Sequence, residues 1–255
     1  AEENPCKLTK ILLTHWHADH VLGLTGLLYT LGMSSYSKTL EIYGPKGTKE
    51  RIDLLQKIYS KFKIKIKIEE IEESQKKVFE NSELLIESLQ MNHNAVTFAY
   101  SVTIKDKIRI DKNKLKKLNL PNSPLIKNLQ EGKDIIHPKT NKKIKASSLI
   151  YVQKGKKVSV ILDTLTNENT TKIAKSSDLL ICEATFSAEE EKRAAEHYHL
   201  TSKQAAEIAK KAKVKSLLLT HLSQKHEHNE KQILLEARKV FQNTKLAAEL
   251  SKIKV

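Results

Sequence analysis

Apolar and polar residues follow two different rhythms along this chain, and each rhythm predicts a type of secondary structure. Residues 62–68 alternate between apolar residues and lysine, which is typical of a half-exposed strand with lysines on its outer face. Residues 46–61 repeat apolar side chains at intervals of three and four, which indicates an amphipathic helix. Further strands are expected at residues 11–13, 39–43, 84–89, 148–152, 158–162, 179–181, 216–219 and the C-terminus, and further helices from about residue 22 and at residues 171–175, 202–212 and 230–241. The mixture predicts an α/β fold.

Residues 105–145 break this pattern. They hold twelve lysines and one arginine against four carboxylates, which is a net +9 of the chain's +15, and they lack a long periodic apolar stretch. We interpret them as a basic arm inserted into a single domain, residues 1–255, and not as a packed layer. The alternative is a solvated insertion without a partner.

Composition narrows the class of protein. The 255 residues are 39% apolar and can bury a sizeable core, but no run of 18 apolar residues occurs, so we expect no membrane contact. Cys6 and Cys182 are too few for a disulfide scaffold, and no secretory signal is visible, which favours a cytoplasmic location. Only four of the 45 basic residues are arginine, which favours attraction to a phosphate backbone over reading of base edges. Glycine-rich phosphate loops are absent from the sequence.

The stretch Thr14-His15-Trp16-His17-Ala18-Asp19-His20 carries the clearest chemistry. Side chains alternate along a strand, so His15 and His17 can reach one metal ion from the same side. Asp19 and His20 follow where the strand gives way to a helix, and they can face a second ion. Imidazoles with a carboxylate suit zinc, and iron or manganese are also possible. The alternative is a histidine-rich surface loop.

Four predicted strands end at a possible metal ligand: His15, His93, Asp163 and His221. Sites in α/β folds form on the loops that leave one end of a sheet, so these residues are expected to meet in a two-ion centre. The remaining histidines of interest lack a preceding strand and are expected on the ordinary surface; they are His137, His197, His226 and His228.

With these residues in hand, the chain resembles the metallo-β-lactamase superfamily and, within it, the ribonuclease Z family of tRNA 3′-processing endonucleases. The superfamily's His-x-His-x-Asp-His signature is matched from His15 to His20. The resemblance implies a four-layer αββα fold. Three more segments resemble family motifs. Cys182-Glu183-Ala184-Thr185 resembles His-Glu-Ala-Thr, and His199-Leu200-Thr201 resembles His-Ser-Thr. Thr220-His221-Leu222-Ser223 resembles Thr-His-Phe-Ser.

The resemblance also implies two zinc ions per subunit and a role for each site residue. Asp19 would orient or deprotonate the attacking water, His199 would protonate the departing ribose 3′-oxygen, and Glu183 would orient His199. One zinc would be held by His15, His17, His93 and Asp163, and the other by Asp19, His20, Asp163 and His221.

The implied substrate is precursor tRNA, cut to leave a 3′-hydroxyl on the tRNA and a 5′-phosphate on the trailer. Pro121-Asn122-Ser123-Pro124-Leu125 resembles part of the family's substrate-binding arm, so the basic segment would be the tRNA-binding exosite. The family also implies a homodimer. The candidate RNA-binding residues of the arm are Lys112, Lys114, Lys116, Lys117, Lys127 and Lys133.

Three departures from the family pattern leave alternatives open. Cys182 replaces a motif histidine, which is expected to alter a contact around the metal ligands, and Leu200 replaces a motif serine. The strands that family members carry before the zinc motif are missing, which predicts a fragment or a split gene product. The alternative functions are another phosphodiesterase of the same fold and a catalytically silent RNA-binding or dimerisation subunit.

Overall fold

The chain divides into two compact units in a computed structural model that describes residues 3–72, 76–120 and 125–255. The first unit comprises Ala1–Glu80, Leu85–Thr103 and Lys157–Val255, and the second comprises Asn81–Leu84 and Ile104–Lys156. The second unit therefore contains the whole segment interpreted as a basic arm, and it continues eleven residues further along the chain. Residues 121–124 of the expected arm motif lie outside the described residues.

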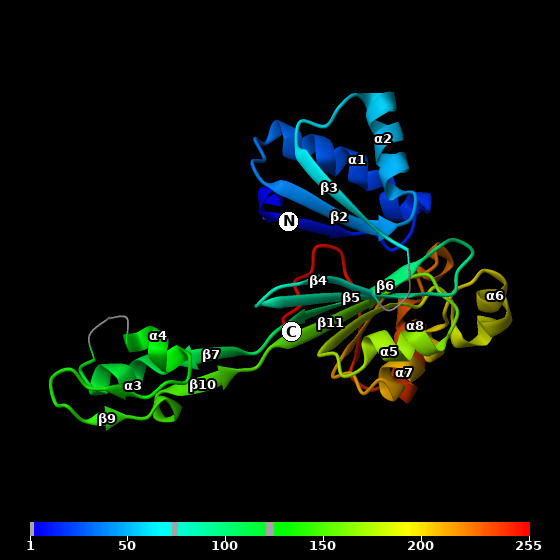
Figure 1. Ribbon diagram of the computed structural model, residues 1–255. Helices are drawn as coiled ribbons and strands as arrows, with labels where there is room; N and C mark the ends of the chain where they lie inside the picture. Colours follow the sequence, from blue (N-terminus) through cyan, green and yellow to red (C-terminus); the bar gives the residue numbers. More distant parts are fainter. Residues whose placement is uncertain (1–2, 73–75, 121–124) are drawn as a thin grey trace. The chain divides into compact units, whose positions relative to one another are not determined.

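The first unit begins with a small parallel sheet in the order β1-β2-β3 (Figure 1). Ile11 lies opposite Ile42 in this sheet, and leucines of the first helix pack on it, with Leu28 and Leu31 fully buried. In the lysine-alternating strand the lysines are exposed and the isoleucines half-buried, as expected. The elements are η1 (Pro5–Lys7), β1 (Lys10–Leu12), α1 (Ala18–Met33), β2 (Thr39–Pro45), α2 (Thr48–Tyr59) and β3 (Lys65–Ile71).

A larger mixed sheet completes the first unit, in the order β14-β13-β12-β11-β6-β5-β4. Its last four strands along the chain are parallel, whereas β4 and β5 are antiparallel. Alanines of α7 pack on buried leucines of β12 and β13 to form the main hydrophobic core. The strands are β4 (Lys76–Glu80), β5 (Leu84–Gln90), β6 (Phe98–Ile104), β11 (Lys156–Ile161), β12 (Leu179–Glu183), β13 (Leu217–Thr220) and β14 (Thr244–Leu246). The helices are α5 (Glu168–Ala174), η3 (Ala188–Glu190), α6 (Glu191–Glu196), α7 (Ser202–Lys211), η4 (Gln224–His226) and α8 (Glu230–Val240).

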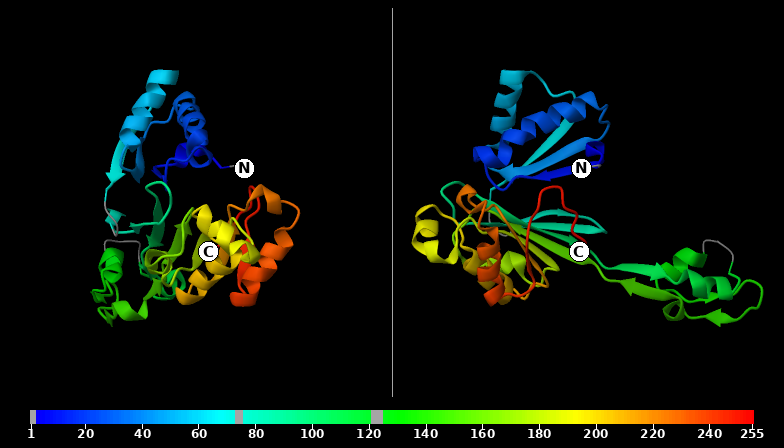
Figure 2. Two further views of the ribbon diagram at one scale, coloured as in Figure 1. Left: turned by 90° about the vertical axis from the view of Figure 1, so that its right-hand side faces the viewer. Right: turned by 180° about the vertical axis from the view of Figure 1, so that it is seen from behind.

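Strand β6, which the sequence pattern did not predict, connects the two sheets. The Tyr100 hydroxyl donates to the Leu13 carbonyl at 2.7 Å, and the Phe98 N–H donates to the Thr14 carbonyl at 2.9 Å. Helices α1 and α2 cover the small sheet, and α5, α7 and α8 cover the large one (Figure 2). The loop after β1 is therefore fixed between two sheets.

The second unit has its own small core, which the lack of a long periodic apolar stretch in this segment did not indicate. Leu129 is fully buried and packs with Ile135, Ile144 and Leu149, because several short elements together shield apolar residues that no single periodic run displays. The prediction that His137 lies on the surface is wrong. Its side chain is buried, and Nε2 of its ring is 2.8 Å from the Leu118 carbonyl oxygen. The elements are β7 (Lys107–Ile110), α3 (Lys112–Lys117), α4 (Leu125–Gln130), β8 (Ile135–Ile136), β9 (Lys143–Ile144), η2 (Ala146–Ser148) and β10 (Ile150–Gln153).

The other histidines expected on the surface differ from one another. His197 and His228 are exposed, whereas His226 is half-buried and pairs with Glu190 at 2.9 Å. Within the described ranges, no helix is both long enough and apolar enough to cross a membrane.

Candidate metal centre

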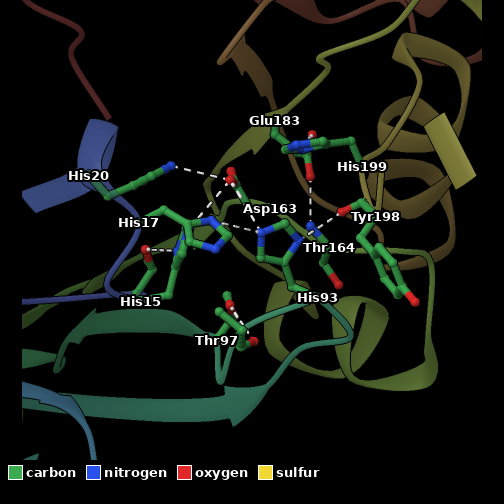
Figure 3. Close-up of polar contacts among 12 residues, drawn as sticks. His15, His17, His20, His93, Thr97, Asp163, Thr164, Glu183, Tyr198 and His199 are labelled. Carbon is green, nitrogen blue, oxygen red and sulfur yellow. Dashed lines mark hydrogen bonds and ion pairs between the residues drawn. The ribbon is translucent and has the colours of Figure 1, made fainter. Parts of the chain in front are cut away.

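Four loops of the first unit bring their histidine and aspartate side chains together (Figure 3). His15 follows β1, His93 follows β5, Asp163 follows β11 and His221 follows β13. Asp163 and His221 have positive φ angles of 41° and 56°, which residues other than glycine adopt rarely and which turn the chain sharply at the end of each strand. The sheet topology thus brings together side chains as far apart in the chain as His15 and His221.

The first cluster consists of His15, His17, His93 and Asp163, and one possible ligand atom from each lies within 4.8 Å of the others. Nδ1 of His17 is 3.2 Å from Nε2 of His93. Oδ2 of Asp163 is 3.5 Å from Nε2 of His15 and 3.8 Å from Nε2 of His93. These four residues are the set assigned above to one zinc.

The second cluster consists of Asp19, His20 and His221, again with ligand atoms within 4.8 Å of one another. Asp163 lies beside it as well: its Oδ2 is 3.2 Å from Nε2 of His20, and its Oδ1 is 3.4 Å from Nε2 of His221. Asp163 therefore stands between the two clusters, where one carboxylate can serve both.

The donor atoms fit metal ions. Nε2 of His15 and Oδ1 of Asp163 are buried and have no hydrogen-bond partner in the described part of the chain. Buried polar atoms normally have a hydrogen-bond partner, so buried atoms that lack one are candidates to bind a metal ion. Imidazole and carboxylate are ligands that zinc accepts.

Electrostatics keep the key ligands in their metal-binding forms. Burial, with the nearby His20, lowers the pKa of His15 to about 4, so its imidazole is neutral near pH 7. Burial alone would raise the pKa of Asp163, but hydrogen bonding from His20 and the charges of His221 and other histidines lower it to about 2. A neutral imidazole and an ionised carboxylate are the forms that coordinate a cation.

Three groups outside the clusters hold the imidazoles in place. The hydroxyl of Thr14 is 3.1 Å from Nδ1 of His15, and the hydroxyl of Thr185 is 3.0 Å from Nδ1 of His221. The carbonyl of Tyr198 accepts from Nδ1 of His93 at 3.0 Å. When one ring nitrogen is held, the other is aimed at the metal position. The sequence analysis assigned no role to these three residues. Both threonines lie within the quoted motifs, but nothing in the sequence indicated Tyr198.

Glu183 and His199 form the expected pair beside the clusters. The fully buried Glu183 carboxylate is 3.0 Å from Nδ1 of His199, and it accepts from the Thr164 N–H and the Thr185 hydroxyl, each at 2.7 Å. Burial lowers the pKa of His199, but the hydrogen bond and charge of Glu183 outweigh it and raise that pKa above its ordinary value. His199 is therefore suited to carry a proton.

His199 also belongs to a third cluster, with Asp163 and His221. Asp19 also contacts His221: its Oδ2 is 3.4 Å from Nε2 of His221, and its side chain is exposed. Burial opposes ionisation of Asp19, but the charge of His20, a backbone hydrogen bond and His221 together lower its pKa below the ordinary value. A proton donor and an ionised acceptor therefore face the same space.

The two departures from the family motifs lie in the apolar core. Cys182 and Leu200 are fully buried in the main hydrophobic cluster with β11, β12 and α7. Cys182 therefore packs among apolar side chains. This placement does not support the prediction that Cys182, in place of the motif histidine, alters a contact around the metal ligands. On a strand its neighbour Glu183 points to the opposite face, toward the site.

The candidate RNA-binding lysines all lie in the second unit and are all exposed. Lys112, Lys114, Lys116 and Lys117 belong to the short helix α3, Lys127 to α4, and Lys133 to the turn after it. Lys114 donates to the Ser148 carbonyl at 3.1 Å, and Lys133 pairs with Glu131 at 2.8 Å. Lys112, Lys116, Lys117 and Lys127 make no such side-chain hydrogen bond or ion pair within the described residues.

Comparison with known proteins decides the family. Residues 1–86 match the family model of the metallo-beta-lactamase superfamily. The chain is 34% identical to ribonuclease Z of Bacillus cereus (strain B4264), over 98% of this chain and 82% of that protein. The chain belongs to the ribonuclease Z family. Ribonuclease Z of Bacillus thuringiensis (strain Al Hakam) shows the same identity and coverage.

Solved structures confirm the expected metallo-β-lactamase fold. The short form of human tRNase Z superposes with a TM-score of 0.68 at 21% identity, over 100% of this chain and 82% of that one. The metallo-beta-lactamase fold protein YhfI from Bacillus subtilis gives a TM-score of 0.64 at 21% identity, over 96% of this chain and 77% of that one. For this member of the ribonuclease Z family, the resemblance identified from its motifs is confirmed.

Proposed function

We propose that this chain is a metal-dependent endoribonuclease that removes 3′ trailers from tRNA precursors. Its membership of the ribonuclease Z family supports hydrolytic tRNA processing. The observation that carries the proposal is the meeting of two donor clusters at Asp163, beside the Glu183–His199 pair. A silent RNA-binding subunit would have no chemical need of these groups, so their presence favours an enzyme over that alternative.

Two zinc ions are the proposed cofactors, with manganese or iron as substitutes. His15, His17, His93 and Asp163 would hold one ion, and Asp19, His20, Asp163 and His221 would hold the other. When bound, such a pair polarises a phosphodiester and lowers the pKa of a water molecule.

The protein's own groups then move the protons. The ionised Asp19 orients the attacking water and accepts its proton, because the carboxylate faces the cluster and is exposed to solvent on its other side. Water adds to the phosphorus while the bond to the ribose 3′-oxygen breaks. Protonated His199, held by Glu183, donates to that departing oxygen. The products carry a 3′-hydroxyl on the tRNA and a 5′-phosphate on the trailer.

The exposed lysines of the second unit are proposed to bind the tRNA backbone. Lysine attracts phosphate as a point charge, without reading sequence. A single tRNA-sized substrate explains a basic surface that a small phosphodiester would not require. The homodimer implied by the family and the cytoplasmic location indicated by the sequence stay predictions.

The proposal is tested with the variants Asp19→Ala and His199→Ala. Each should lower cleavage of a 3′-extended precursor tRNA by on the order of 100-fold or more, since each removes a proton-transfer group. Binding of the precursor, measured by filter retention, should persist in both variants.

Asp53→Ala and His228→Ala are the matched controls, because they remove an exposed carboxylate and an exposed imidazole elsewhere. Metal content, measured by mass spectrometry after dialysis, should be two ions per wild-type chain. If Asp19→Ala and His199→Ala both cleave the precursor at the wild-type rate, the proposed mechanism is wrong.

A further inference from the structure

Tyr198 occupies the turn between His197 and His199 in a left-handed conformation, with φ of 60°. This backbone conformation orients the carbonyl group of Tyr198. It presents the Tyr198 carbonyl to Nδ1 of His93 at 3.0 Å, which aims the other nitrogen of that ring at the first cluster (Figure 3).

The left-handed conformation explains how the Tyr198 carbonyl reaches His93, but it does not explain why this position holds a tyrosine. Glycine and asparagine adopt positive φ readily, whereas a bulky side chain is disfavoured there. Core packing does not explain the residue either, because Tyr198 is 39% exposed. Its hydroxyl makes no hydrogen bond with another described residue. Neither the turn nor the core therefore requires an aromatic ring at this position.

The Tyr198 ring lies beside the imidazole of His93, which belongs to the first donor cluster. Its centroid is 6.4 Å from the His93 ring, and the His93 ring is 5.4 Å from that of His199. The neighbouring Phe186 is used differently: it is buried, and it stacks on His197 at 6.0 Å with the planes 21° apart. The Tyr198 ring is thus partly exposed and lies beside His93.

We propose that Tyr198 is a specificity-determining residue whose ring stacks on the nucleobase next to the scissile phosphate. The inference rests on the proposed function, because it needs an RNA substrate. Proteins recognise unpaired bases at RNA ends by stacking them on aromatic side chains, and such stacking tolerates any base because every base has a π-face. A base held there would fix the adjoining phosphate over the clusters.

Tyr198→Asn and Tyr198→Phe separate the ring from the backbone. Asparagine tolerates the left-handed turn but removes the ring, and phenylalanine keeps it. For a 3′-extended precursor tRNA, kcat/KM should fall about tenfold or more in Tyr198→Asn and stay within about twofold in Tyr198→Phe. Tyr59→Asn, which removes another exposed tyrosine, is the matched control.

Two further measurements exclude a merely structural role. Metal content of Tyr198→Asn should equal that of the wild type, and loss of metal there would overturn the stacking role. Precursor with 5-iodouridine on either side of the scissile phosphate, irradiated with Asp19→Ala protein to prevent cleavage, should crosslink to Tyr198. Crosslinking elsewhere, or an unchanged kcat/KM in Tyr198→Asn, would overturn the inference alone. Failure of the wild type to cleave the precursor would overturn the proposed function with it.

Discussion

Glu183 shows how much one residue can organise in this protein. Its two carboxylate oxygens accept hydrogen bonds from Thr164, Thr185 and His199, and the Thr185 hydroxyl also contacts His221. A buried carboxylate without these donors would be unstable as an anion, because burial disfavours charge. The contacts keep Glu183 in place and tie the proton donor to one ligand of the second cluster.

The two thiols provide a test at the residue scale. Burial, and secondarily the charge of Glu183, raises the pKa of Cys182 well above its ordinary value, and its side chain is fully enclosed. Cys6 is only partly buried. Since the thiolate is the reactive form, a disulfide reagent should modify one thiol per native chain, at Cys6, and two in denaturant.

Peptide mapping of the labelled protein identifies the modified residue. Cys6→Ser is the control and should leave the native chain unreactive. Rapid labelling of Cys182 under native conditions would contradict its placement in the core.

At the scale of elements, helix α7 begins three residues after His199 and is fixed by its cap. The Thr201 side chain accepts from the Gln204 N–H at 3.2 Å, and the Gln204 side chain accepts from the Thr201 N–H at 2.9 Å. This capping box satisfies two backbone donors that the first turn leaves unpaired. The alanines of α7 then pack into the main core, so the cap connects the His199 turn to that core.

Thr201→Ala should lower the free energy of unfolding by about 1 kcal/mol more than Thr201→Ser, because only serine keeps the capping oxygen. Both variants lose the buried methyl group, so the comparison isolates the hydroxyl. Urea denaturation followed by circular dichroism measures the difference. Equal stabilities of the two variants would show that the cap contributes nothing.

At the scale of the whole molecule, the chain carries +15, and residues 105–145 carry +9 of it. The charge is placed on a unit with its own core, so it resides on a folded surface and not on a loose loop. A folded surface can present lysines at fixed spacings, which suits a structured RNA.

Replacing Lys112, Lys114, Lys116 and Lys117 by alanine should weaken precursor tRNA binding most at low salt. Each lost phosphate contact should reduce the slope of log affinity against log salt by about 0.7 to 0.9. Filter binding across a salt series measures both effects. The matched control replaces Lys57, Lys61, Lys63 and Lys65, which are equally exposed in the first unit. If both quadruple variants lost the same affinity for precursor tRNA, the effect would come from net charge and not from the position of the lysines.

The sequence by itself determined the donor residues, the strands that end at them and the charge of the second unit. These features are local: periodicity reports which face of an element is buried, and a ligand that follows a strand is fixed by its neighbours. Strand β6 escaped prediction because its buried run, Phe98 to Ser101, lacks alternation.

Only the tertiary structure decided how distant groups meet. It set the Asp163 carboxylate between two clusters, as the family resemblance implied, and brought the Tyr198 carbonyl to a ring 105 residues earlier. It also placed Cys182 in the apolar core and buried His137 against expectation. Such contacts depend on which strands are neighbours and on the backbone angles at their ends, such as the positive φ of Asp163 and His221. Those angles are set by packing of the whole unit, and no short stretch of sequence contains that information.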